Sequence, residues 1–351
     1  MIHSVSLRTA AKDFGIIRLM ELRYIDASLQ TAWEDLVKNN SASGYMQSFF
    51  WTEFKNLLGW ETFKIGIFED DKLVGGAIVG KYSHYKNRSF LIIPEGPVLP
   101  YAEAKAEQMF EMLISEVDKI ANLTGKKLSS HLSIEPNLKE TPKFFNRFVK
   151  AKSDNQPIKT LIIDLTLSED EILKQMKPKG RYNIKVAQKA GAKVEVVNIN
   201  DGIKDFVKLY QRYKDRENYE TKHDSYFEAL AYSVTKENSD MFFVKYKGEI
   251  LSAAIVIYFG NKSTFLFGAN SDKHKNVMAS YLLQFEIIKR AKKLGFKVYD
   301  LYGLAPNEED LLHPWHGFSV FKRKLGGKEI EYIGGYNFIY NKKLYKEFLK
   351  D

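Results

Sequence analysis

FKIGIFEDDKLVGGAIVGKY (63–82) and MFFVKYKGEILSAAIVIYFG (241–260) follow one pattern, and this repeat decides the fold. Each segment begins with an apolar run, passes through a charged turn and continues with a second apolar run that starts at small residues. The pattern is typical of two β-strands joined by a short turn. A third strand is predicted after each segment, at 89–97 and at 263–271.

A long helix is predicted next in both halves, at 103–125 and 279–295. Each helix ends at a glycine, the usual helix stop, and leads into a further strand, at 126–134 or 296–304. A β-β-β-α-β order that recurs after about half the chain predicts two similar units. The expected fold class is therefore α+β, with a mixed sheet in each unit.

The composition agrees with two globular domains. The chain has 351 residues, of which 44% are hydrophobic and 28% are charged. A polar segment with one proline, AKSDNQPIK (151–159), is the candidate linker. We therefore predict domains at 1–155 and 156–334. An amphipathic helix is expected in the tail, within about 335–351; it can pack back on the first domain, although the sequence alone does not settle its host.

Several classes of protein are disfavoured by the composition. The chain has no cysteine, which excludes disulfides and thiolate chemistry. Charges at Arg8, Lys12, Asp13 and Arg18 interrupt the N-terminal stretch and argue against a signal peptide. No uncharged run of about 18 residues is present, so no transmembrane segment is expected. A cytoplasmic location fits these features.

Positive charge is concentrated in one short stretch. The formal net charge is +9, and six Lys or Arg residues stand between 171 and 190 against the single acid Glu171. Arg181, Lys185 and Lys189 are four apart, so they align along one face of a helix. Two readings remain open at this point: a solvated lysine-rich surface, and a ridge that binds phosphate groups.

The order of elements is similar to that of the N-acetyltransferase (GNAT) fold. In that fold a glycine-bearing loop before the long helix binds the pyrophosphate of acetyl-CoA through backbone N–H groups. The corresponding stretches here, 100–105 and 272–279, contain no glycine, and Val277 and Met278 would crowd a pyrophosphate. We therefore expect an acyl donor other than CoA, and no cofactor.

Several motifs together resemble the FemABX family of aminoacyltransferases, which build peptidoglycan cross-bridges. They are RYNIKVA (181–187), GFSVFKRKLGG (317–327), GYMQSFFWTEFK (44–55) and IPEGPVL (93–99). The resemblance implies a tandem pair of GNAT-like domains, aminoacyl-tRNA as donor, and a UDP-muropeptide or lipid II as acceptor. Peripheral contact with a membrane surface fits the second acceptor. The chain is similar to the short members of the family, because no heptad run for a coiled-coil arm is present.

The resemblance implies direct aminolysis of an aminoacyl ester, with Phe321 and Lys322 as the catalytic pair. The Phe321 backbone N–H would face the tetrahedral oxyanion, and the Lys322 ammonium would neutralise developing charge or contact the donor. We expect this pair on a strand presented by the HPWHG loop (313–317). Two histidines three apart are weak grounds for a metal site, and no metal is predicted.

Six residues are predicted to bind substrate. Lys55 matches a family lysine that meets the acceptor's phosphate, and Arg181 and Lys185 are expected to grip phosphate groups. Tyr182 would stack or donate a hydrogen bond, and Tyr302 ends a strand beside the expected site. Phe267 stands where relatives often have a tyrosine, so a hydroxyl contact is lost.

Further positions bear on the acceptor and on alternative functions. Asp300 would orient a base or simply end its strand. Glu95 replaces the arginine of the family's P-R-G-P pattern, and Pro100 stands where an aspartate is common, which puts the stem-peptide contacts of the acceptor in question. Two alternatives remain: an acetyl-CoA-type N-acyltransferase, and a non-catalytic protein that binds RNA or a membrane surface.

Overall fold

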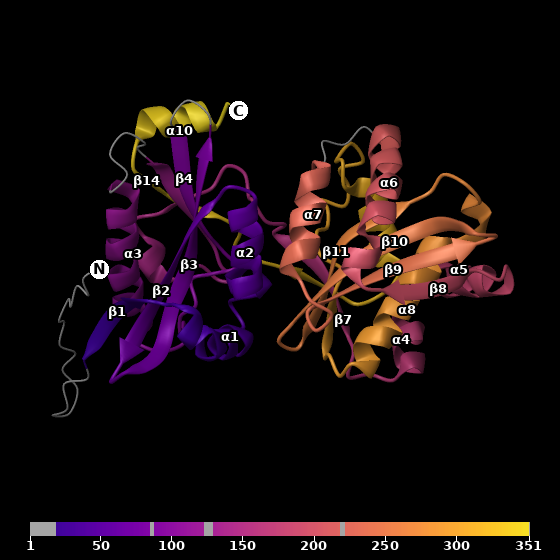
Figure 1. Cartoon of the computed structure of the whole chain (residues 1–351), viewed down its shortest axis with the longest axis horizontal. Coiled ribbons are helices and arrows are strands. Elements are labelled where there is room, and N and C mark those ends of the chain that lie inside the picture. Colours follow the sequence, from indigo (N-terminus) through magenta and orange to yellow (C-terminus); the bar gives the residue numbers. More distant parts are fainter. Residues whose placement is uncertain (1–18, 85–87, 123–128, 218–221, 351) are drawn as a thin grey trace. The chain divides into compact units, whose positions relative to one another are not determined.

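The computed structural model describes residues 19–84, 88–122, 129–217 and 222–350, which form two compact units (Figure 1). Unit 1 contains the residues up to Gln156 and the segment from Tyr332 onward, and unit 2 is Pro157–Glu331. Each unit is built on a seven-stranded mixed sheet with helices on both faces. The predicted α+β class with two similar units is confirmed. The charged N-terminal stretch lies outside the described residues.

Unit 1 has the strand order β1-β2-β3-β4-β5-β14-β6. Helix α3 covers one face of the sheet, and α1 and α2 cover the other (Figure 1). Its elements are β1 (Met20–Tyr24), α1 (Gln30–Lys38), α2 (Phe49–Leu57), β2 (Glu61–Glu69), β3 (Lys72–His84), β4 (Arg88–Pro94), α3 (Ala106–Asn122), β5 (Ser129–Glu135), β6 (Val149–Lys150), β14 (Tyr336–Ile339) and α10 (Lys342–Phe348).

Unit 2 has the strand order β13-β7-β12-β11-β10-β9-β8. Helices α4, α5 and α8 pack on one face, and α6 and α7 pack on the other. Its elements are β7 (Lys159–Asp164), α4 (Glu169–Gln175), α5 (Pro178–Lys189), β8 (Lys193–Val197), α6 (Ile199–Glu217), α7 (Asp224–Ser233), β9 (Ser239–Tyr246), β10 (Glu249–Phe259), β11 (Lys262–Asn270), α8 (Ala279–Lys293), β12 (Val298–Asp300), α9 (His316–Arg323) and β13 (Lys328–Glu331).

The repeat that decides the fold begins with a pair of equivalent β-hairpins. Two residues with positive φ join the strands in each: Asp70 and Asp71 in unit 1, and Lys247 and Gly248 in unit 2. Positive φ at both positions defines the two-residue turn whose twist matches paired antiparallel strands. The repeat is longer than the sequence indicated, because a strand and two helices (β1-α1-α2 and β8-α6-α7) precede each hairpin.

The chain leaves the first sheet after β6, builds the second sheet from β7 to β13, and returns to the first sheet with its last strand. β6 is followed by β7, which pairs with β12 and β13 in unit 2. β13 is followed by β14, which returns to unit 1 and pairs with β5 and β6. The tail helix α10 then packs against β5, with Phe348 in ring contact with Phe90 and His131. Its host, which the sequence left open, is therefore unit 1.

The central parallel pair of strands differs between the two sheets. In unit 1, β4 and β5 remain paired from Ser89↔Ser129 to Pro94↔Glu135. In unit 2, β11 and β12 pair only at Lys262↔Val298, Ser263↔Tyr299 and Thr264↔Asp300. Beyond Thr264 the two strands separate, so the sheet of unit 2 is open at this place while the sheet of unit 1 is closed.

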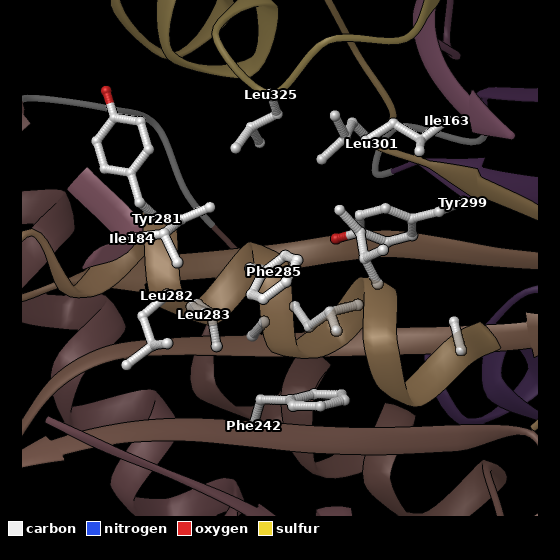
Figure 2. Packing of buried hydrophobic residues seen from close by; sticks show 14 of the residues in the cluster. Ile163, Ile184, Phe242, Tyr281, Leu282, Leu283, Phe285, Tyr299, Leu301 and Leu325 are labelled. Carbon is white, nitrogen blue, oxygen red and sulfur yellow. The ribbon is translucent and has the colours of Figure 1, made fainter. Parts of the chain in front are cut away.

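The core of unit 2 holds α5 and α8 against the sheet. Figure 2 shows part of this cluster, which includes Ile184 of α5, Leu282, Leu283 and Phe285 of α8, and Phe242 of β9. Val277, just before α8, is 2% exposed and belongs to the same core. The expectation that the Val277 side chain would crowd a pyrophosphate is therefore wrong, because the side chain points inward. None of the helices in the described part of the chain is both long and apolar enough to cross a bilayer.

Candidate active site

The opening between β11 and β12 contains a pocket of about 360 Å³. It lies entirely within unit 2, and β11, α6, α8 and α9 all contribute to its wall. Its lining is mainly aromatic and apolar, with a small number of polar groups. The lining includes Tyr210, Tyr213, Phe267, Gln284, Tyr302, Gly303, Phe321 and Lys322.

A β-bulge shapes the wall that β11 provides. In the pairing of β10 with β11, Ile255 faces Phe267 and Val256 faces Phe265, so Leu266 is the extra residue. A bulge interrupts the alternation of side chains along a strand. As a result, the three consecutive residues Phe265, Leu266 and Phe267 all line the pocket.

Lys322 is the buried cation of this pocket. The residue is 7% exposed, and its Nζ donates hydrogen bonds to the carbonyl oxygens of Tyr302 (2.8 Å) and Gly303 (2.7 Å). The ammonium also lies 4.8 Å from the centroid of the Phe318 ring. An ammonium has three N–H groups, and the described residues accept two of them, which leaves one for a ligand in the pocket.

The environment of Lys322 shifts the pKa of its ammonium group into the physiological pH range. Burial lowers the pKa of Lys322 to about 7, and the nearby charge of Asp300 opposes this shift. Burial disfavours the charged form of a lysine, and an opposite charge favours it. A perturbed lysine in a pocket of this size is a candidate for catalysis.

Asp300 also fixes the turn that holds Lys322. Its Oδ1 accepts the Tyr302 N–H at 2.7 Å and the hydroxyl of Thr160. Tyr302 has a φ of +56°, which is unfavourable for a residue with a side chain. The strained turn aims the carbonyl oxygens of Tyr302 and Gly303 at the Lys322 ammonium. It also ends β12 at Asp300, earlier than the predicted strand 296–304.

The structure corrects the expected setting of Phe321. Phe321 and Lys322 lie on the helix α9 and not on a strand. In an α-helix each interior N–H points along the axis to the carbonyl four residues earlier, so the Phe321 N–H is not aimed into the pocket. The side chain of Phe321 lines the pocket and contacts the Tyr281 ring edge-on at 4.9 Å.

Phe267 packs in an aromatic wall of the pocket and, without a hydroxyl, makes no polar contact there. Its ring contacts Phe227 at 5.1 Å, Tyr226 at 5.9 Å and Tyr210 at 6.2 Å between centroids. Burial raises the pKa values of Tyr226 and Tyr210, so both hydroxyls stay protonated at neutral pH. Phe267 therefore lines the pocket, where its role in substrate binding stays a prediction, and tyrosines from α6 bring hydroxyl groups to the lining.

Arg181, predicted to bind phosphate, makes contacts with the backbone of α4. Its Nη1 donates to the carbonyl oxygens of Leu173 (3.4 Å), Lys174 (3.5 Å) and Met176. These carbonyls lie at the C-terminal end of α4, where backbone acceptors lack helical partners. Nη1 of Arg181 thus caps α4, while Lys185 and Lys189 lie on the exposed face of α5, and phosphate binding by the three cations stays a prediction.

The remaining predicted residues lie outside the pocket. Tyr182 is 67% exposed on α5, next to the exposed Lys185. Lys55 belongs to unit 1, where its Nζ lies among aromatic rings, 4.8 Å from Trp60 and 5.5 Å from Trp51. Glu95, which departs from the family pattern, is buried and accepts the Met46 N–H at 2.9 Å. His313, of the HPWHG loop, accepts the Trp315 N–H at 3.0 Å and shapes a turn.

The comparison with known families decides the assignment. A sequence model of the FemAB family matches residues 30–161, 143–244 and 231–349, which together span most of the chain. The chain belongs to the FemAB family. Its relatives include the lipid II:glycine glycyltransferase of Staphylococcus epidermidis, 24% identical over 393 aligned residues that cover 88% of this chain and 91% of that protein. The protein of the same name from Staphylococcus aureus strain MRSA252 is 22% identical over 387 residues.

Solved structures place the FemAB fold of this chain among tandem acyltransferase folds. The crystal structure of FemX has a TM-score of 0.80 at 21% identity and covers 93% of this chain and 99% of its own. A tandem GNAT protein from the clavulanic acid pathway has a TM-score of 0.54 at 11% identity, with 91% and 98% covered. At these identities the similarity establishes the fold, and the tandem GNAT-like architecture is confirmed.

Three residues that line the pocket of this FemAB chain were not predicted from its sequence: Tyr210, Tyr213 and Gln284. Tyr210 and Tyr213 come from α6, far from any motif in the sequence. Gln284 interrupts an apolar stretch of α8, YLLQF (281–285), and is 1% exposed. A polar residue in the middle of an apolar helix face was the available signal for Gln284, because such residues are rarely buried without a role.

Proposed function

We propose that this chain is an aminoacyltransferase that moves an amino acid from aminoacyl-tRNA to the stem-peptide amine of a peptidoglycan precursor. Membership of the FemAB family and the names of the staphylococcal relatives support the transfer of an aminoacyl group. The observation that carries the proposal is the buried Lys322, which keeps one N–H for a ligand in the open sheet of unit 2. We assign the reaction to the cytoplasm, where charged tRNA is available.

In the proposed reaction the acceptor nitrogen attacks the ester carbonyl carbon of the donor. A tetrahedral oxyanion forms, the bond to the ribose 3′ oxygen breaks, and the proton lost by the amine goes to that oxygen. The remaining N–H of Lys322 donates to the oxyanion. Because the ester is already activated, positioning and charge stabilisation are sufficient, and no covalent nucleophile is required.

The protonation of Lys322 predicts the pH dependence of the reaction. The charged form is the active one in this mechanism, and burial lowers the pKa of Lys322 to about 7. Activity that depends on a protonated group falls as pH rises through the pKa of that group. We therefore expect a descending limb near pH 7 in the profile of kcat/KM, which reports groups of the free enzyme.

The variant Asp300→Asn provides the matching control for this limb. Because the charge of Asp300 raises the pKa of Lys322, its removal lowers that pKa further. The asparagine oxygen can still accept the Tyr302 N–H, so the turn is retained. The descending limb is expected to move to lower pH, and a limb that stays in place in this variant would assign the titration to another group.

The exposed lysines of α5 are expected to contact tRNA phosphates. Lys185 and Lys189 are exposed and have no ion pair with any described residue. The double variant Lys185→Glu/Lys189→Glu is expected to weaken tRNA binding about tenfold at 0.1 M salt and to reduce the salt slope, because each lost phosphate contact removes about 0.7–0.9 from it. Binding is measured by filter retention over a salt series. The exposed Lys236→Glu is the control, and equal losses in both variants would argue against this contact.

The direct test is a transfer assay with both possible acceptors. The protein is incubated with a mixed pool of charged tRNAs, a UDP-muropeptide and lipid II, and the products are weighed by mass spectrometry. One acceptor is expected to gain the mass of one amino acid, and deacylated tRNA is expected in equal amount. No mass change with any donor, together with tight binding of acetyl-CoA, would replace this proposal by a CoA-dependent acyl transfer.

A further inference from the structure

Gln284 is a buried polar residue that the mechanism above does not use. It lies on α8 one turn after Ser280, and both residues line the pocket. Gln284 is 1% exposed, and its neighbours Leu282, Leu283 and Phe285 belong to the apolar core. A carboxamide in such surroundings is costly unless its hydrogen-bonding groups find partners.

One end of the Gln284 amide is fixed by Tyr299. The Tyr299 hydroxyl donates to Gln284 Oε1 at 2.6 Å. Figure 2 shows this hydroxyl turned toward the part of α8 that carries Phe285. Burial raises the pKa of Tyr299 well above its usual value, so the hydroxyl keeps its proton.

The orientation of the amide follows from the partners of that hydroxyl. Among the described residues, the Tyr299 hydroxyl has no hydrogen-bond acceptor besides Gln284. A flipped amide would direct Nε2 at the hydroxyl and leave the buried O–H without an acceptor, at a cost of about 1–3 kcal/mol. Oε1 therefore faces Tyr299, and the Nε2 group is directed elsewhere.

The Nε2 group of Gln284 has no acceptor within the part of the chain that the structure describes. Across the described ranges no hydrogen bond from Nε2 is formed, yet Gln284 lines the pocket. Nε2 is also absent from the polar atoms that are sealed from solvent without a partner, so it reaches the pocket. A primary amide nitrogen carries two N–H donors and no acceptor. The ligand atom that suits it is an oxygen that only accepts, such as a carbonyl oxygen or an oxyanion.

We propose that Gln284 donates a hydrogen bond to the carbonyl oxygen of the acyl group undergoing transfer, with Tyr299 as the residue that positions it. This inference rests on the proposed function, because it assumes an acyl donor in the pocket. It supplies the second oxyanion donor, beside Lys322, that the Phe321 N–H does not provide from inside α9. The bond strengthens as charge develops on the oxygen, so it acts mainly on the transition state.

The test compares Gln284→Met and Gln284→Glu with the unaltered protein in the transfer assay. Methionine keeps the volume of the side chain and removes both donors, while glutamate keeps the acceptor for Tyr299 and replaces the donors by a carboxylate. Both variants are expected to lose about 10²-fold in kcat, the lower end of the range for one oxyanion donor, with little change in KM. Two different replacements keep the test decisive if one variant fails to fold.

Two further variants separate positioning and folding from contact with the substrate. Tyr299→Phe leaves the Gln284 donors in place but frees the amide to rotate, so we expect a smaller loss in kcat, about threefold to tenfold. Gln30→Met, an exposed glutamine in unit 1, is the control for the chemical change and should keep full activity.

The outcomes distinguish this inference from the proposed function. Unchanged kcat in a folded Gln284→Met, with active unaltered protein, overturns the role of Gln284 and leaves the proposed function intact. A loss that appears only in KM also overturns it, because the contact would then be made equally in the ground state. Failure of the unaltered protein to transfer any aminoacyl group overturns the proposed function and this inference together.

Discussion

Lys322→Met is expected to lower kcat about 10³-fold while KM for the donor stays within a few fold. Methionine fills a similar volume but cannot donate to the oxyanion, and loss of one preorganised donor costs about 10²–10³ in kcat. We expect a loss in kcat at the upper end of this range, because Lys322 also brings a positive charge to a pocket that contains few polar groups. The measurement is single-turnover transfer from charged tRNA at pH 6.5, on the acid side of the pKa of about 7 that burial gives Lys322.

The matched control is Lys328→Met, which changes an exposed lysine on β13. It should retain full activity. Thermal unfolding of both variants guards against misfolding, because Lys322→Met also removes the donor to the carbonyls of Tyr302 and Gly303. Equal activities of the two variants would move the chemistry away from this pocket.

Gly180→Ala is expected to destabilise the protein by about 3 kcal/mol, a typical cost of forced overpacking against backbone. An added Cβ would lie 2.4 Å from the carbonyl oxygen of Lys324, and backbone cannot rotate away from it. The Lys177 N–H donates to this same oxygen at 3.1 Å, so the start of α5 rests directly on the end of α9.

The same change should also lower kcat, because Lys324 follows Lys322 by two positions at the end of α9. A displacement of α9 moves the ammonium, and a misplacement of about 1 Å costs roughly 10²-fold in rate. Stability is measured by urea unfolding and kcat by the transfer assay. The control Gly317→Ala also lies on α9, where an added Cβ meets nothing within 4 Å, and it should stabilise the helix by about 0.5–1 kcal/mol. If Gly180→Ala were as stable as this control, the close approach of α5 to α9 would be refuted.

Local signals predicted the hairpins and the long helices. The turns at Asp70-Asp71 and Lys247-Gly248 and the glycine stop at 295 are readable in the sequence because they are fixed by neighbouring residues, while the predicted stop at 125 lies outside the described residues. The strand expected at FSVFK (318–322) is wrong because a segment this short has no periodicity that separates a strand from a helix. The helix is held in place by a residue outside the segment, because the Ala305 N–H donates to Ser319 Oγ at 2.8 Å.

The candidate site was only partly predictable for the same reason. Phe267, Tyr302, Phe321 and Lys322 were found through motifs, and all four line one pocket. Gln284 could not be predicted, because the sequence does not show which face of α8 lies at the opening between β11 and β12. Arg181 shows a second limit of the sequence pattern, because a cation four residues from another can bind a ligand, cap the carbonyl end of a neighbouring helix, or do both.

The return of β14 to unit 1 has a consequence for biosynthesis. β14 lies between β5 and β6, yet it follows Lys150 by 186 positions (336 − 150). At about 5–20 residues per second, a ribosome needs roughly 10–40 s to span this interval. The N-terminal sheet therefore emerges with a bare edge on β5, which invites wrong pairing, while Pro157–Glu331 already has all its strands. The first half to be translated is the last to be completed, so nascent chains should need chaperone protection at that edge until translation ends.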